Sequence, residues 1–244
     1  MSARFDAMVF DLFGTLVPEF SRSDFYASVR TAADVLGVDR DAFERGWTRT
    51  AHERQTGGYP GGVEENVRTI VASLGVPEPP DEVLAAALET RSGLYDRWFH
   101  PRDGAVETLR DVKARGYPIA LISMCAPDTP ERWRASEMAP LVDVTIFSSE
   151  TGLRKPDPAI YLAATDRLGV APERCLYCGD GAYGELSGAA GVGMTAALIH
   201  PPDLDVAEAL TPEPEEDWRG PVVGHLRELL DLLPIGDEVT STDR

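Results

Sequence analysis

The chain lacks the features that mark several classes of protein. No stretch of its 244 residues approaches the roughly 20 consecutive apolar residues of a membrane span. The first residues, MSARFDAMVFDLFGTL, show no basic segment followed by a long apolar run. Positive charge is scarce, since 23 Lys and Arg stand against 41 Asp and Glu for a formal net charge of −18. We therefore expect a cytoplasmic protein that binds neither nucleic acid nor membranes.

Cysteine and histidine are also too few to suggest a structural metal or a disulfide framework. There are three cysteines, an odd number that is typical of a reduced compartment. Cys175 and Cys178 form a CxxC pair, but no second pair exists and the four histidines are scattered. The pair also falls in an apolar run typical of a strand, so we expect neither zinc binding nor redox chemistry there.

What the sequence has is a regular alternation of strand and helix after residue 100. Hydrophobic residues make up 43% of the chain, which is enough for a substantial core. Strands are predicted at residues 7–11, 119–123, 144–148, 174–179 and 195–199, and helices at residues 105–115, 131–139, 158–168, 185–191 and 225–233. This pattern predicts an α/β fold with a Rossmann-like parallel sheet and helices on both of its faces.

Residues 19–100 differ in character from the rest of the chain. They contain no alternating strand pattern, and their apolar spacing predicts helices at residues 25–36, 41–55, 63–74 and 82–98. We therefore predict an all-helical cap at residues 19–100 that is inserted into an α/β core made of residues 1–18 and 101–244. An irregular acidic loop is expected at 201–218 and a frayed tail at 237–244, while the sequence does not indicate an oligomeric state.

Four residues with chemically useful side chains lie at or just beyond the predicted strand ends. They are Asp11, Ser123, Lys155 and Asp180. Each has an ordinary structural explanation, such as capping a turn or standing as a solvated charge before a proline. Because the carboxyl ends of parallel strands gather at one edge of a sheet, all four are instead expected to converge on a single site.

The sequence around these residues resembles a known family. The matching segments are VFDLFGTLV at residues 9–17, LIS at 121–123, GLRKPDP at 152–158, and CGD at 178–180 followed by Glu185 and Gly188-Ala189. In this order and spacing they resemble the four motifs of the haloacid dehalogenase-like hydrolase superfamily. The helical insertion resembles the cap of one subclass.

The resemblance implies a Mg²⁺-dependent hydrolase that acts on a small-molecule substrate. Asp11 would be the nucleophile and would form a covalent aspartyl intermediate. Mg²⁺ would be held by the carboxylates of Asp11 and Asp180 and by the backbone carbonyl of Phe13. Ser123 and Lys155 would contact the phosphoryl group, and the backbone near Gly14 and Thr15 would complete the anion site. Glu185 would orient water or Lys155 from behind these groups.

One position departs from the phosphatase pattern. The residue two after the nucleophile is usually an aspartate that protonates the leaving group and then activates water, but here it is Phe13. General acid–base assistance is typically worth ~10²–10⁴-fold. Dehalogenases of the superfamily often carry an aromatic residue there, because halide leaves without a proton. A 2-haloacid dehalogenase is therefore an alternative, as is a weakly catalytic binding or regulatory protein.

Other positions favour phosphate chemistry. Dehalogenases need no metal, so a metal-type Asp180 favours a phosphatase that acts on a phosphorylated metabolite. The insertion also shows no clear counterpart of the dehalogenase arginine that receives halide, since Arg40, Arg45, Arg49 and Arg54 qualify only by their place in the sequence and are expected on the surface. Met124 replaces a residue that is often polar, which removes one potential hydrogen bond to substrate.

Overall fold

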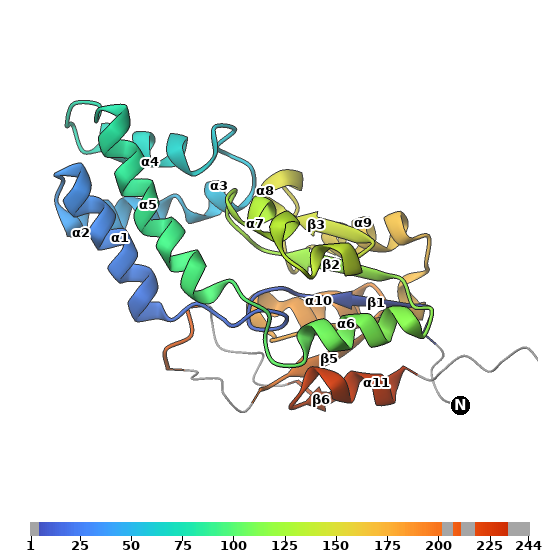
Figure 1. Ribbon diagram of the computed structural model, residues 1–244. Coiled ribbons are helices and arrows are strands. Elements are labelled where there is room, and N and C mark those ends of the chain that lie inside the picture. The colour runs from blue at the N-terminus through green and yellow to red at the C-terminus, as the bar shows by residue number, and fades with distance from the viewer. Residues whose placement is uncertain (1–4, 202–206, 211–217, 234–244) are drawn as a thin grey trace, which may run out of the picture.

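A six-stranded parallel sheet lies at the centre of the computed structural model, which describes residues 5–201, 207–210 and 218–233 (Figure 1). The strands follow the order β3-β2-β1-β4-β5-β6. Their bounds are β1 Ala7–Phe10, β2 Ile119–Ser123, β3 Val144–Phe147, β4 Cys175–Gly179, β5 Thr195–Ile199 and β6 Val222–Val223. All pairs are parallel, so the carboxyl ends of the strands share one edge and β1 lies between β2 and β4.

Helices cover both faces of the sheet, as the sequence predicted. One face packs against α6 (Ala105–Ala114) and α11 (Leu229–Leu232), and the other against α9 (Pro158–Leu168) and α10 (Glu185–Gly191). The three central strands β1, β2 and β4 are buried on both sides and therefore lack polar alternation. The side chains of the CxxC pair point to opposite faces of the sheet, since Cys178 packs on the side of α6 and α11 and Cys175 on the side of α9 and α10. Two side chains on opposite faces cannot share one metal ion.

Five helices lie between β1 and α6 and pack around a core of their own. They are α1 (Arg22–Leu36), α2 (Arg40–Arg49), α3 (Ala51–Gln55), α4 (Gly62–Ser73) and α5 (Asp81–Trp98). Phe43, Trp47 and Ile70 are among the buried residues at their centre. In Figure 1 these helices, coloured blue to green, gather beside one end of the sheet. The predicted helix at 41–55 is divided at Thr50, which ends α2 and precedes α3.

Several shorter elements differ from the sequence prediction. The helix expected at 131–139 is α7 (Thr129–Ala135) followed by a 3-10 turn at Ala139–Leu141, and Ser148 begins the short helix α8 (Ser148–Thr151) rather than ending β3. The final helix begins with a 3-10 turn at Leu226–Glu228 before α11. The two-residue β6 was not predicted, because so short a strand has no periodic pattern.

Two of the predicted irregular segments lie partly or wholly outside the described residues. Residues 202–206 and 211–217 of the expected acidic loop are not described, and neither is the predicted tail at 237–244. Within the ranges that the structure does describe, no helix combines the length and the apolarity needed to cross a bilayer.

Candidate active site

The residues predicted at strand ends lie along one edge of the sheet. Asp11 follows β1 directly, Ser123 is the last residue of β2, and Asp180 follows β4. The Asp11 backbone N–H donates to the Cys178 carbonyl at 2.9 Å, which fixes the start of the nucleophile loop against β4. Lys155 enters from the loop after α8, and its ammonium contacts Asp11. The structure therefore brings Asp11, Lys155 and Asp180 together, with Ser123 on the adjacent strand.

The Lys155 ammonium joins two carboxylates in the interior. It donates to Asp11 Oδ1 and to Glu185 Oε2, the latter at 2.5 Å, and the residue is only 2% exposed. Burial alone would lower the pKa of Lys155, but Asp11 and Glu185 together raise it above its ordinary range. Lys155 therefore stays charged at every pH at which the protein is expected to work.

Glu185 is fully occupied in holding this lysine. Besides the ammonium, Oε2 accepts a hydrogen bond from the Tyr177 hydroxyl at 2.6 Å, and Oε1 accepts one from the Gly181 N–H at 2.9 Å. Gly179 is needed for this close fit, because a Cβ at that position would lie 2.0 Å from Glu185 Oε1. With both oxygens engaged, Glu185 is placed to orient Lys155 rather than to contact substrate.

The cluster of carboxylates carries more negative than positive charge. Asp11, Asp180 and Glu185 each place a carboxylate oxygen within 4.8 Å of the others. Among the residues that the structure describes, Lys155 is the one cation in contact with them. Burial raises the pKa of Asp11 to about 7, although Lys155 opposes the shift. Burial, followed by the charges of Glu185 and Asp11, raises the pKa of Asp180 well above its usual range.

The donor set fits a divalent cation of the Mg²⁺ type. Such an ion prefers carboxylate and carbonyl oxygens, and two further positive charges would balance the three carboxylates and one ammonium. Because both oxygens of Glu185 are already engaged, Asp11 and Asp180 are the better-placed ligands.

A glycine allows Asp180 to lie against the nucleophile loop. Gly14 has a left-handed φ of +77°, and a Cβ on it would lie 2.1 Å from Asp180 Oδ2. The other carboxylate oxygen, Oδ1, accepts a hydrogen bond from the Ala182 N–H at 2.9 Å. Any larger residue at position 14 would displace this carboxylate, so the loop after β1 and the loop after β4 depend on each other for their placement.

Two hydroxyls near the strand ends are buried without a conventional partner. Ser123 and Thr15 are both 0% exposed. Within the described ranges neither hydroxyl has a hydrogen-bond partner, apart from a contact between Ser123 and the Cys125 thiol. Buried hydroxyls are usually hydrogen-bonded, so these two are available to donate to a ligand.

Phe13 belongs to an aromatic group at the junction of the sheet and the helical insertion. Its ring centroid lies 5.0 Å from that of Phe20 and 6.1 Å from that of Phe99. Tyr95 of α5 packs edge-on against Phe20 at 5.2 Å. The Phe13 side chain thus has a packing role in addition to its place beside the nucleophile, and its carbonyl stays a predicted metal ligand.

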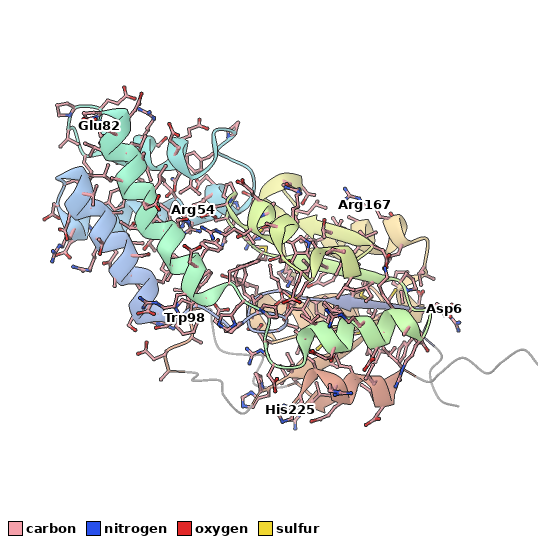
Figure 2. All side chains as sticks on the ribbon, in the orientation of Figure 1. Asp6, Arg54, Glu82, Trp98, Arg167 and His225 are labelled. Atoms are coloured by element: carbon pink, nitrogen blue, oxygen red, sulfur yellow. The ribbon has the colours of Figure 1, made fainter. Side chains whose placement is uncertain are left out.

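A small cavity of about 90 Å³ lies between the nucleophile loop and the helical insertion. From the sheet side it is lined by Phe13, Met124 and Tyr183, among others. From the insertion it is lined by residues that include Phe25, Arg54, Gln55, Arg91 and Tyr95. Figure 2 shows Arg54 on the side of the insertion that faces the sheet. Side chains from both parts of the chain therefore meet beside Phe13, in the loop that follows the candidate nucleophile.

Two residues of this region escaped the sequence prediction. Tyr177 looked like an ordinary strand residue, and no sequence signal reveals its hydrogen bond to Glu185. Arg54 was expected on the surface together with Arg40, Arg45 and Arg49. That expectation holds for the other three but is wrong for Arg54, which is only 5% exposed. Long-range packing within the insertion, which local spacing does not encode, buries its guanidinium.

Comparison with known proteins settles the family. A match to the haloacid dehalogenase-like hydrolase family covers residues 5–193. The chain belongs to this family. As a haloacid dehalogenase-like hydrolase it is an enzyme, and it carries the ordered motifs from which the resemblance was inferred.

Relatives of this hydrolase include proteins of both candidate chemistries. An (S)-2-haloacid dehalogenase 4A from Burkholderia cepacia is 28% identical over 82% of this chain and 87% of its own length. A phosphoserine phosphatase from Thermus thermophilus is 26% identical over 84% of each chain. The crystal structure of a HAD phosphatase from Thermococcus onnurineus, 19% identical, superposes with a TM-score of 0.63 over 93% of this chain and 97% of its own, which shows the shared fold. These similarities leave phosphatase and dehalogenase chemistry to be distinguished at the site itself.

Proposed function

We propose that the chain is a Mg²⁺-dependent phosphatase that acts on a small phosphorylated metabolite through Asp11. The observation that carries this proposal is the buried cluster of three carboxylates with one contacting ammonium. A dehalogenase needs no metal and gains nothing from the extra carboxylate of Asp180. A phosphatase can use that carboxylate to hold Mg²⁺ beside the nucleophile.

Asp11 and Asp180 would hold the ion, together with the Phe13 carbonyl that the family resemblance implies. When bound, Mg²⁺ would reduce the repulsion between the attacking carboxylate and an anionic phosphoryl group. Lys155 and the bound ion would together favour the ionised form of Asp11, and Lys155 would place a second positive charge near the phosphoryl oxygens. The buried hydroxyls of Ser123 and Thr15 would donate hydrogen bonds to those oxygens.

The reaction would then proceed in two displacements at phosphorus. A carboxylate oxygen of Asp11 forms a bond to phosphorus while the bond to the leaving oxygen breaks. The leaving oxygen takes its proton from a water molecule enclosed with the substrate, because Phe13 cannot supply one. Water next attacks the phosphorus of the aspartyl phosphate, which releases inorganic phosphate and regenerates Asp11.

We further propose that residues 19–100 act as a cap over this site. The shared cavity supports this role, as do the contacts of α5 with the loop after β2 and with the start of α7. Arg91 pairs with Asp128 through two nitrogens, and the Tyr95 hydroxyl bonds Thr129 Oγ1 at 2.7 Å. A closed cap would exclude bulk water from the reacting groups.

The metal site gives the first prediction. Asp180→Ala should remove Mg²⁺-dependent hydrolysis of an activated aryl phosphate and most of the thermal stabilisation that Mg²⁺ confers. Calorimetric titration and thermal melts, each with and without Mg²⁺, measure the two effects. Asp103→Ala, an exposed aspartate before α6, is the matched control. An unchanged Mg²⁺ affinity in the folded Asp180 variant would contradict the assignment.

A second prediction concerns proton supply. Without a general acid at position 13, the rate should depend steeply on the pKa of the leaving group, so activated aryl phosphates should react far faster than alkyl phosphates. Phe13→Asp should flatten this dependence, with a gain for poor leaving groups of up to ~10²-fold. Rates for a series of aryl phosphates, measured on both proteins, give the two slopes.

The same substitution removes an aromatic contact with Phe20 and Phe99, so its stability must be followed in parallel. Phe13→Leu serves as the control, because it also loses the aromatic contacts but supplies no proton. Equal slopes for the wild type and a folded, Mg²⁺-binding Phe13→Asp would show that proton transfer at this position does not limit the rate.

Dehalogenation of a 2-haloacid is the second candidate function. Phe13 beside an aromatic cavity favours it, as does the 28% identity to the Burkholderia cepacia dehalogenase over most of the chain. Halide departs without a proton, so the absence of a general acid at position 13 would not slow this reaction. Chloride release from a 2-chloroacid in the presence of EDTA, without phosphatase activity, would replace our proposal with this one.

A further inference from the structure

Arg54 is held rigidly in the interior of the helical insertion by neutral groups. Its Nη1 donates to the carbonyl of Trp47 at 3.1 Å and to Asn66 Oδ1 at 2.9 Å. The same nitrogen lies 3.3 Å from Thr50 Oγ1, and the guanidinium carbon lies 3.9 Å from the centre of the Trp47 ring. These contacts fix the orientation of the guanidinium without neutralising its charge.

Among the residues that the structure describes, no carboxylate forms an ion pair with this cation, although the charge of Asp128 favours its charged form. The nearby Asp128 is already taken by Arg91, whose Nε and Nη2 both donate to it. Burial, and next the charge of Arg91, lowers the pKa of Arg54 to about 9. A buried charge without a counter-ion is costly, and in proteins such groups are normally paired. The arrangement therefore lacks an anion.

The position of Arg54 shows where that anion would lie. Arg54 lines the cavity beside the nucleophile loop, together with Phe13 and Met124. Much of the remaining wall is aromatic, and it includes Phe25 and Tyr95. A ligand of this cavity would thus meet apolar surface along its body and two guanidinium groups from the insertion, of which Arg91 is already paired with Asp128. The volume of about 90 Å³ restricts it to a few heavy atoms.

We propose that Arg54 binds a carboxylate of the substrate, so that the substrate is a small organic acid carrying the group that Asp11 attacks. The planar guanidinium matches a carboxylate through its Nε and Nη2 edge, since its hydrogen bonds to Trp47, Thr50 and Asn66 all use Nη1. A single negative charge also suits this cavity better than a second phosphate, because the side chain of Glu19 already contributes a carboxylate to its wall. The inference rests on the proposed function only in placing the hydrolytic site at Asp11.

Ligand binding without turnover tests the assignment directly. Propionate has a carboxylate and no leaving group, and propionamide is its uncharged counterpart of nearly equal shape. We expect the wild type to prefer propionate in a titration followed by Trp fluorescence, because Trp47 stacks on the guanidinium. Arg54→Met should lower propionate affinity by roughly tenfold to a hundredfold, the value of a hydrogen bond to a charged group, and leave propionamide binding unchanged.

Two further variants separate charge from structure. Arg54→Lys keeps the charge without the fork and should retain part of the preference. Arg49→Met removes an exposed arginine of α2 and should have no effect. Because the partners of Arg54 are neutral, Arg54→Met leaves no buried carboxylate behind and should stay folded, which circular dichroism checks.

The outcomes distinguish this inference from the proposed function. Selective propionate binding lost in Arg54→Met supports the inference even if no phosphate ester is hydrolysed. Phosphatase activity without any preference for propionate over propionamide would overturn it and leave the proposed function intact. Chloride binding that depends on Arg54, with no carboxylate preference, would also overturn it and would make Arg54 the halide acceptor of a dehalogenase.

Discussion

Replacing Asp11 by asparagine is expected to lower kcat by roughly 10⁴-fold or more, because a carboxamide of the same shape cannot form the covalent intermediate. The protein should stay folded. The carboxamide oxygen of the variant can still accept a hydrogen bond from Lys155. The substitution also removes one negative charge from a cluster in which negative charge exceeds positive charge. In the absence of metal, the melting temperature should therefore be unchanged or slightly higher.

Single-turnover assays with an activated aryl phosphate measure this loss, and mass spectrometry of quenched wild type should detect the phosphorylated aspartate. Asp6→Asn is the matched control, since Asp6 lies just before the amino end of the same strand and is exposed. Near-wild-type turnover by a folded Asp11→Asn protein would show that Asp11 is not the nucleophile, and the proposed mechanism would be wrong.

Lys155→Met should produce the largest change in stability. The substitution leaves Asp11 and Glu185 buried and without the ammonium that both of them contact. Breaking a buried pair by removing one partner typically costs ~3–5 kcal/mol of unfolding free energy. The surface pair between Lys113 and Asp143 offers a comparison, since Lys113→Met should cost at most ~1 kcal/mol.

The cost of Lys155→Met should depend on pH in a defined direction. In the folded wild type the pKa of Asp11 is already raised to about 7, and loss of the ammonium raises it further. The unfolded chain has an ordinary Asp pKa of about 4, so the raised pKa of the folded state favours folding fully only below that pH. This contribution to stability is lost as pH rises through the pKa of Asp11 in the folded protein. Chemical denaturation should therefore show a larger deficit near pH 8 than near pH 5. Adding Glu185→Gln should recover part of the loss, and a deficit independent of pH would contradict this electrostatic origin.

The fold was predictable from the sequence because its signals are local and repeated. Apolar runs that end in Asp11, Ser123 and Asp180 mark strand ends, and helices between them imply a parallel sheet. The strand order then brings the site residues together, because β1 lies between β2 and β4 and so places Asp11 beside Asp180. The short elements β6 and α8 were missed, because two to four residues carry no periodicity.

The features that were not predictable depend on contacts between distant segments. Nothing near Arg54 in the sequence shows that Trp47 and Asn66 would bury it while Arg45 and Arg49 stay exposed. Likewise, the hydrogen bond from Tyr177 to Glu185 arises only when β4 and α10 pack together. The strand-end residues form the site, and the sequence pattern predicts them because they follow apolar runs. Side chains such as Arg54 and Tyr177 support the site through long-range contacts, which the sequence pattern does not show.

The two ends of the helical insertion are joined by hydrogen bonds to the same short loop. The Arg102 backbone N–H donates to the Leu16 carbonyl at 2.8 Å, and its Nη2 donates to the Gly14 carbonyl at 3.2 Å. The chain leaves and re-enters the sheet at neighbouring points, and the entropic cost of closing such an excursion grows only with the logarithm of its length. A change in the length of residues 19–100 would therefore leave the two joined ends, and the strand-end residues beside them, in place.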